Sequence, residues 1–80
     1  MNPRQRKEID TTTYTGRFAE RLRTLREKKR LTVDELAVKS GISERTLFSW
    51  EGAERSPSIE QLPQLASALG VSVRTLMPEK

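Results

Sequence analysis

The chain has 80 residues, of which 34 % are hydrophobic and 32 % are charged, and it contains neither cysteine nor histidine. This length suits one small domain. The absence of cysteine excludes disulfides, thiolate metal ligands and thiol nucleophiles. No apolar run approaches the ~20 residues that span a membrane, and the N-terminus has no signal-peptide core. We therefore expect a cytoplasmic protein without membrane contact.

The charge balance favours an anionic partner. The formal net charge is +4 and the isoelectric point is near 10. Residues 17–30 hold seven cations and two anions, whereas residues 42–58 hold two cations and three anions. The first stretch is also compatible with a solvated helix that carries salt bridges. Composition alone leaves both interpretations open.

Catalysis is not expected. Without histidine or cysteine, a general base or a metal site would depend on carboxylates. The acidic pairs Asp34/Glu35 and Glu51/Glu54 fit helix capping and ion pairing better. We predict no catalytic residue, no cofactor and no metal site.

The N-terminal residues 1–15 are polar and lack sustained periodicity, which predicts a flexible arm. Its cations Arg4, Arg6 and Lys7 are candidates for a DNA-contacting arm, and a plain tail is the alternative. The domain itself is expected over residues 16–80.

The first helix is predicted from about Arg17 to Lys29. Phe18, Leu22 and Leu25 mark its buried stripe at helical spacing. The cations at its end complement the negative end of the helix dipole.

A second helix is predicted near residues 33–40. Thr32 and Glu35 form a capping box, in which the threonine oxygen accepts a backbone N–H and the glutamate reaches back. Gly41 supplies the left-handed residue that ends this helix.

A third helix is predicted near residues 43–52, with Ser43 as its cap and Leu47 and Trp50 facing inward. The outer face then holds Glu44, Arg45, Phe48 and Ser49. Two short helices about a glycine turn, the second with a polar outer face, form a helix-turn-helix. Such a second helix fits the major groove of DNA.

The C-terminal third predicts two more helices. Ser58 and Gln61 suggest a capping box that opens a helix through Leu69, but Pro63 would then break an internal hydrogen bond. The alternatives are an irregular first turn and a start nearer Gln61. A last short helix, capped by Ser72, carries Val73, Leu76 and Met77. The predicted fold class is all-α, with five helices.

The order of these motifs resembles the small phage-repressor-like helix-turn-helix family, whose members are also called lambda-repressor-like or Xre domains. The resemblance runs from Arg17 to about Met77 and includes residues 21–26, 56–62 and 65–72. It implies a compact five-helix domain that binds double-stranded DNA in a sequence-specific way. The expected role is transcriptional repression by a homodimer that reads the major groove with residues 43–52.

The resemblance assigns base contacts to Ser43, Glu44, Arg45 and Ser49. Arg45 is the strongest candidate, because a guanidinium can bond O6 and N7 of guanine together. Glu44 is suited either to a cytosine amino group or to a structural, repulsive role near phosphates. Ser49 is able to bond a base or a phosphate.

The remaining implied roles lie around this helix. Thr32 and Arg55 match DNA-backbone contacts, and Phe48 either touches a thymine methyl group or is partly buried at the helix edge. The resemblance also predicts a structural ion pair between Arg26 and Glu51, partly buried between the first and third helices.

Three positions depart from the family pattern. Arg30 stands where glycine is common, which predicts a strained left-handed residue. Val33 replaces a glutamine that bridges to phosphate in relatives. The glycine after the third helix comes one residue early, as Gly52 instead of at Ala53.

Two further expectations concern partners. Val73, Leu76 and Met77 are the candidate homodimer contact, with closure of the core as the alternative. A second functional hypothesis keeps the fold as a protein-interaction module, an antitoxin or coactivator with a partner such as a toxin. The sequence does not separate a phage regulator, a restriction–modification controller and an antitoxin.

Overall fold

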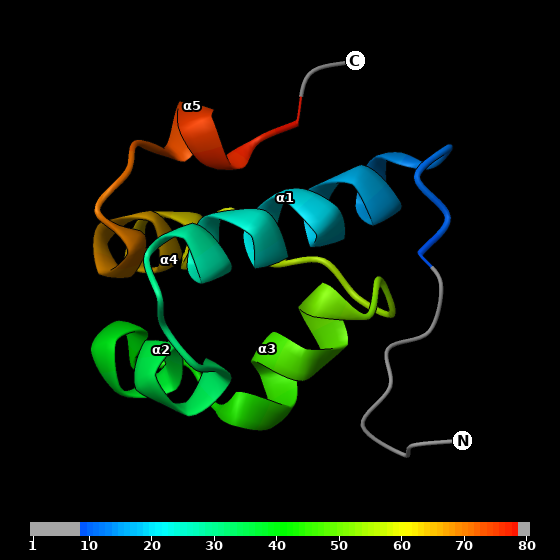
Figure 1. Cartoon of the computed structure of the whole chain (residues 1–80). Coiled ribbons are helices and arrows are strands. Elements are labelled where there is room, and N and C mark those ends of the chain that lie inside the picture. The colour runs from blue at the N-terminus through cyan, green and yellow to red at the C-terminus, as the bar shows by residue number, and fades with distance from the viewer. Residues whose placement is uncertain (1–8, 79–80) are drawn as a thin grey trace.

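The computed structural model describes residues 9–78, which form five helices and no strand (Figure 1). The all-α prediction is confirmed. The helices are α1 (Tyr14–Lys28), α2 (Val33–Ser40), α3 (Glu44–Glu51), α4 (Gln61–Leu69) and α5 (Val73–Leu76).

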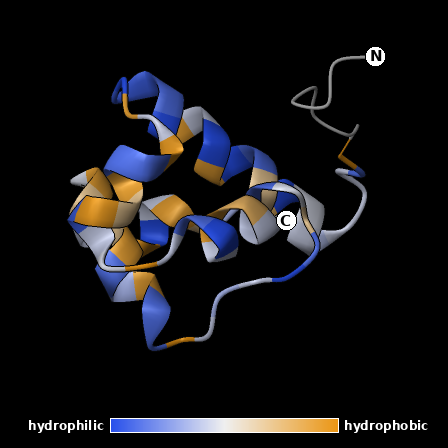
Figure 2. Cartoon of the chain, turned by 90° about the horizontal axis from the view of Figure 1, so that it is seen from below, coloured by the Kyte–Doolittle hydropathy of each residue, from blue (hydrophilic) through white to orange (hydrophobic). Residues whose placement is uncertain are grey.

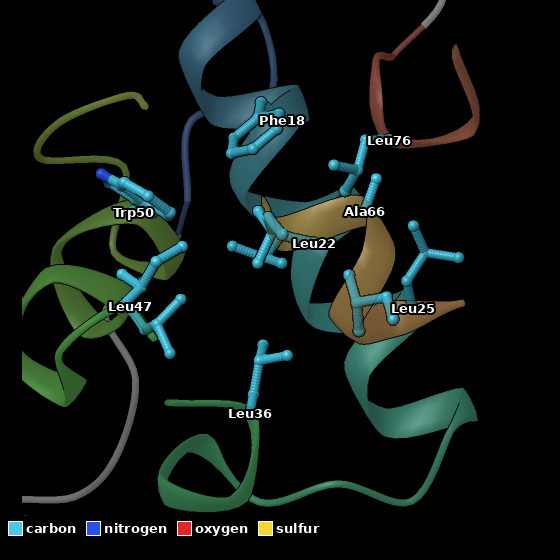
Figure 3. Packing of buried hydrophobic residues seen from close by; sticks show 11 residues of the cluster. Phe18, Leu22, Leu25, Leu36, Leu47, Trp50, Ala66 and Leu76 are labelled. Carbon is cyan, nitrogen blue, oxygen red and sulfur yellow. The ribbon is translucent and has the colours of Figure 1, made fainter. Parts of the chain in front are cut away.

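Helix α1 crosses the middle of the molecule, with α2 and α3 on one side, α5 on the other and α4 behind it (Figure 1). It packs on α3 and α5, while α2 packs on α3 and α4. Along each helix hydrophobic residues alternate with hydrophilic ones, as a single buried face requires (Figure 2). The side chains of Phe18, Leu22, Leu36 and Leu47 point into one shared core (Figure 3).

Helix α1 begins earlier than predicted, at Tyr14 instead of Arg17. The hydroxyl oxygen of Thr13 caps it by accepting the N–H of Gly16 at 2.9 Å. The preceding turn is held by Asp10, whose carboxylate accepts both the N–H and the hydroxyl of Thr12. These hydrogen bonds lower the pKa of Asp10.

The predicted boundary between arm and domain, at residues 15 and 16, therefore falls inside α1. A Cβ atom added to Gly16 would lie 1.8 Å from the carbonyl oxygen of Asp10, so the turn rests directly on the helix. Residues 1–8 of the predicted arm, with Arg4, Arg6 and Lys7, lie outside the described residues.

The capping signals of the helix-turn-helix are confirmed. Thr32 and Glu35 form both halves of the capping box at the start of α2. Gly41 ends α2 with φ 76°, and Ser43 caps α3. Leu47 and Trp50 are buried, as predicted.

Two residues other than glycine adopt the left-handed conformation. Arg30 has φ 59°, which confirms the expected strain between α1 and α2. After α3 the left-handed residue is Ala53, at φ 61°, whereas Gly52 has an ordinary φ of −89°. Gly52 therefore does not relieve the backbone strain of this turn.

We expect Arg30→Gly and Ala53→Gly each to raise the free energy of unfolding by about 1 kcal/mol, because glycine has no Cβ to strain. Gly41→Ala should lower it by a similar amount, since open space surrounds Gly41 and only its backbone conformation opposes alanine. Urea denaturation measures all three. A lower midpoint for either glycine variant would contradict the assigned strain.

Helix α4 starts at Gln61, which confirms the alternative prediction and corrects the start at Ser58. Only half of the predicted capping box forms, with the N–H and hydroxyl of Ser58 donating to Oε1 of Gln61. Pro63 is then the third residue of the helix. The first four N–H groups of a helix have no partner within it, so proline costs little there.

Helix α5 closes the core. Leu76 is wholly buried, and Val73 and Met77 are partly buried against the core cluster. They reach the core because α5 packs on both α1 and α4. The structure thus shows the alternative, in which Val73, Leu76 and Met77 close the core.

Candidate nucleic-acid interface

The outer face of α3 gathers the predicted base-contacting residues. Glu44 and Arg45 are exposed, Phe48 is 58 % exposed, and Ser49 is partly exposed. The opposite face, with Leu47 and Trp50, is locked into the core. Phe48 is therefore not buried at the helix edge but presents its ring to solvent.

Arg45 is the cationic side chain on the outer face of α3. Among the described residues its guanidinium has no hydrogen-bond or ion-pair partner. Glu44 is its only charged neighbour on the outer face of α3, so the two formal charges cancel. Arg45 has its full hydrogen-bonding capacity for a base edge, but α3 offers phosphates no net attraction.

Two residues that were predicted to contact DNA, Ser43 and Thr32, use their hydroxyl groups as helix caps. The hydroxyl of Ser43 accepts the N–H of Thr46 and donates to its Oγ1 at 2.9 Å. The hydroxyl of Thr32 likewise accepts the N–H of Glu35 and donates to Asp34 at 2.7 Å. Either hydroxyl would have to exchange a partner to donate to DNA. Asp34 and Glu35 also oppose a phosphate beside Thr32.

Arg55 lies in the loop after α3, and its exposed side chain has no hydrogen-bond or ion-pair partner within residues 9–78. The loop folds back, because the N–H groups of Glu54 and Arg55 both donate to the carbonyl of Ser49, at 2.9 and 3.4 Å. This places the backbone of Arg55 beside the last turn of α3, next to the predicted base-contacting face.

A buried ion pair holds α3 in place. Nε and Nη2 of Arg26 donate to the two carboxylate oxygens of Glu51 at 2.6 and 3.0 Å. The side chains are only 11 % and 6 % exposed. A third donor, Nη1, bonds the carbonyl of Leu31 at 2.8 Å, and the pairing raises the pKa of Arg26. The predicted pair is confirmed, and it ties α3 to α1 and to the start of α2.

Several cations of α1 are used within the fold. Arg17 donates to the carbonyls of Thr11 and Thr12, and Nε of Arg21 donates to the carbonyl of Thr75 at 2.8 Å. Arg23 pairs with Glu27 at 3.5 Å. Sequence reasoning missed the roles of Arg17 and Arg21, since a carbonyl partner leaves no mark on residue type. The pair of Arg23 with Glu27 fits the interpretation of a solvated helix that carries salt bridges.

Within residues 9–78, no three acidic side chains are grouped so that they could hold a metal ion. In the same part of the chain, no helix is both long and apolar enough to cross a bilayer.

The sequence that builds this site matches a known family. The profile described as helix-turn-helix matches residues 22–76. The chain belongs to the helix-turn-helix family. The predicted resemblance to phage-repressor-like domains is thereby confirmed, together with the fold.

Similar helix-turn-helix proteins include transcriptional regulators. The regulator SinR of Bacillus subtilis (strain 168) is 37 % identical over 64 residues, which cover 79 % of this chain and 58 % of SinR. The transcriptional repressor RghR of the same organism is 39 % identical over 61 residues, covering 75 % of this chain and 45 % of RghR. The chain thus spans about half the length of these curated relatives.

A solved structure has the same fold over nearly its whole length. The restriction–modification controller protein C.AhdI from Aeromonas hydrophila aligns with a TM-score of 0.74 and 34 % identity. The alignment covers 76 % of this helix-turn-helix chain and 92 % of C.AhdI.

Proposed function

We propose that this helix-turn-helix chain is a sequence-specific DNA-binding transcriptional regulator. It reads the major groove of double-stranded DNA with α3 and acts as a homodimeric repressor on a two-fold site. The observation that carries the proposal is the outer face of α3, where Arg45 is exposed and has no partner within residues 9–78, while the inner face is fixed in the core. RghR, a relative named as a repressor, supports the direction of regulation.

Rigid placement of α3 is what makes base reading feasible. Hydrogen bonds to base edges discriminate only if the helix approaches the groove in one orientation. The Arg26–Glu51 pair and the buried Leu47 and Trp50 supply that orientation. We assign base contacts to Arg45 and Ser49, a thymine-methyl contact to Phe48 and a backbone contact to Arg55.

The balance of charge around α3 sets the expected affinity. Cations that neutralise phosphates supply most non-specific DNA binding. The face of α3 has no net charge, and Asp34 and Glu35 stand at the start of α2. We therefore propose weak binding to random DNA, with sequence preference depending heavily on Arg45. We also propose that the protein acts in the cytoplasm and has no catalytic role.

A second candidate function is a protein-interaction module, such as an antitoxin or coactivator. The observation that favours it is the exposure of two large apolar side chains on the helix-turn-helix, Val38 at 85 % and Phe48 at 58 %. Binding to random duplex DNA at low salt separates the two functions, because only a DNA-binding protein shows a salt-dependent affinity there.

The test of the proposed function is Arg45→Ala on the preferred DNA site, selected from a random library. We expect a loss of about 1–3 kcal/mol in binding and a relaxed preference at one base pair, a G·C. Arg55→Ala should instead weaken all sequences about equally and lower the salt slope by about one unit. Fluorescence anisotropy at several salt concentrations measures both.

Both side chains are exposed, so neither variant should lose helical content, which circular dichroism checks. If Arg45→Ala retained the affinity and the sequence preference of the parent, α3 would not be the reading helix. The protein-interaction function would then be favoured.

A further inference from the structure

An apolar groove lies outside the face assigned to DNA. It has a volume of about 220 Å³ and is lined by Tyr14, Phe18, Pro57, Ile59, Leu62 and Met77. Two of these large side chains remain open to solvent, Ile59 at 84 % and Tyr14 at 46 %. A single exposed apolar side chain is ordinary, but two on the rim of one apolar groove indicate a contact surface.

The groove joins three parts of the chain. One wall is the first two turns of α1, the other is the segment between α3 and α4 together with Leu62 at the start of α4, and Met77 after α5 contributes the end. None of these residues belongs to the outer face of α3. The groove therefore does not overlap the outer face of α3.

A basic hollow adjoins the groove along α1. It is lined by Arg17 and Arg21 together with Glu20, Thr24 and Pro78. The two hollows are neighbours, because the guanidinium of Arg17 lies 5.6 Å from the centroid of the Tyr14 ring and the hydroxyl of Tyr14 donates to the carbonyl of Pro78. Two guanidinium groups outnumber the single carboxylate of Glu20, so the hollow favours an acidic group.

The opposite wall carries the complementary charge. Glu60 is exposed and follows Ile59 directly, and among the described residues it has no hydrogen-bond or ion-pair partner. The same surface thus presents the apolar side chain of Ile59 and the acidic side chain of Glu60. Close to them lie the apolar groove and the basic hollow. A surface that is complementary to itself is what a two-fold contact requires.

We propose that a second copy of this chain docks on the groove. Ile59 of each copy packs against Tyr14 and Met77 of the other, and Glu60 of each faces the basic hollow of the other. This inference rests on the proposed homodimeric regulator, and it replaces Val73 and Leu76 as the dimer contact. Met77 is retained from the predicted contact.

The position of the groove suits a dimer on DNA. The wall with Pro57 and Ile59 follows α3 in the chain, and the fold-back of Glu54 and Arg55 keeps that loop against the helix end. In the proposed dimer the two-fold axis runs so that both copies of α3 lie on the same side. The half-site centres are then expected about 34 Å apart, one turn of DNA.

The test measures self-association of the full chain by sedimentation equilibrium. Ile59→Glu should raise the dimer dissociation constant at least about tenfold, because a carboxylate would enter the apolar groove. Val38→Glu is the matched control, since Val38 is equally exposed on another surface, and it should leave the constant unchanged. Ile59→Ala should have a smaller effect than Ile59→Glu.

Charge exchange tests the second half of the contact. Glu60→Arg and Arg21→Glu should each weaken association, and the double variant should restore it. A parent that stays monomeric at millimolar concentration would overturn the proposal. Equal association of Ile59→Glu and the parent would also overturn it.

DNA binding distinguishes this inference from the proposed function. If Ile59→Glu binds an isolated half-site like the parent but loses cooperative binding to the two-fold site, both proposals are supported. If the parent dimerises through Ile59 but binds no DNA, the dimer contact stands and the DNA-binding function fails. If the parent binds DNA as one chain per duplex, the dimer contact fails and α3 remains the reader.

Discussion

Replacing Glu51 by alanine is expected to lower the free energy of unfolding by about 3–5 kcal/mol. The substitution leaves the guanidinium of Arg26 buried, with its side chain 11 % exposed, and removes two of its hydrogen-bond acceptors. The carbonyl of Leu31 would remain as its partner. A buried charge that loses its counterion is among the most destabilising single changes in a small domain.

Chemical denaturation with urea measures this loss, and Arg23→Ala serves as the control. Arg23 pairs with Glu27 on the surface at 3.5 Å, with side chains 36 % and 51 % exposed. Removing an exposed pair should cost at most about 1 kcal/mol. If Glu51→Ala and Arg23→Ala unfolded at the same urea concentration as the parent, the Arg26–Glu51 pair would contribute no more than a surface pair.

Leu47→Ala is expected to destabilise the domain by about 2–5 kcal/mol. Leu47 is wholly buried and packs in the shared core beneath α3 (Figure 3). The loss combines the transfer of apolar surface with a cavity that neighbouring side chains fill only partly. A domain of 80 residues has a total stability of roughly 4–12 kcal/mol, so this single change removes a large part of it.

The neighbouring residue provides a matched control on the same helix. Phe48 is 58 % exposed, so Phe48→Ala should change the free energy of unfolding by less than about 1 kcal/mol. Under the proposed function the two variants should separate stability from recognition, because Phe48 contacts DNA and Leu47 does not. A larger loss of stability for Phe48→Ala than for Leu47→Ala would reverse the assigned faces of α3.

Residue spacing was sufficient to predict the elements that rest on short-range contacts. The capping box of Thr32 and Glu35, the stop at Gly41 and the cap at Ser43 each depend on hydrogen bonds within four residues. The inward and outward faces of α3 follow from the helical period by the same short-range logic. The Arg26–Glu51 pair came instead from the resemblance to a family, since 25 residues separate its members.

Predictions from short-range sequence signals failed where several such signals stood close together in the chain. Thr11, Thr12 and Thr13 are all suitable caps, and the predicted helix began after all of them. In the structure the cap of α1 is Thr13, because Asp10 accepts hydrogen bonds from Thr12 and the preceding turn packs against Gly16. At the end of α3, the left-handed position falls on Ala53, where the family pattern has glycine. The length of α3, held by its packed side chains, sets where the turn falls.

By itself the sequence determined the fold class, the helix-turn-helix and the residues that face outward from α3, because each depends on neighbours a few positions away. Only the tertiary structure decided the roles of residues whose partners are distant. Nε of Arg21 donates a hydrogen bond to the carbonyl of Thr75, which lies 54 residues further along the chain. Leu76 is buried because α5 packs on α1 and α4. The groove beside Ile59 likewise exists only where three separate segments meet. Such partners depend on which surfaces come together, and that is decided by packing the whole core at once.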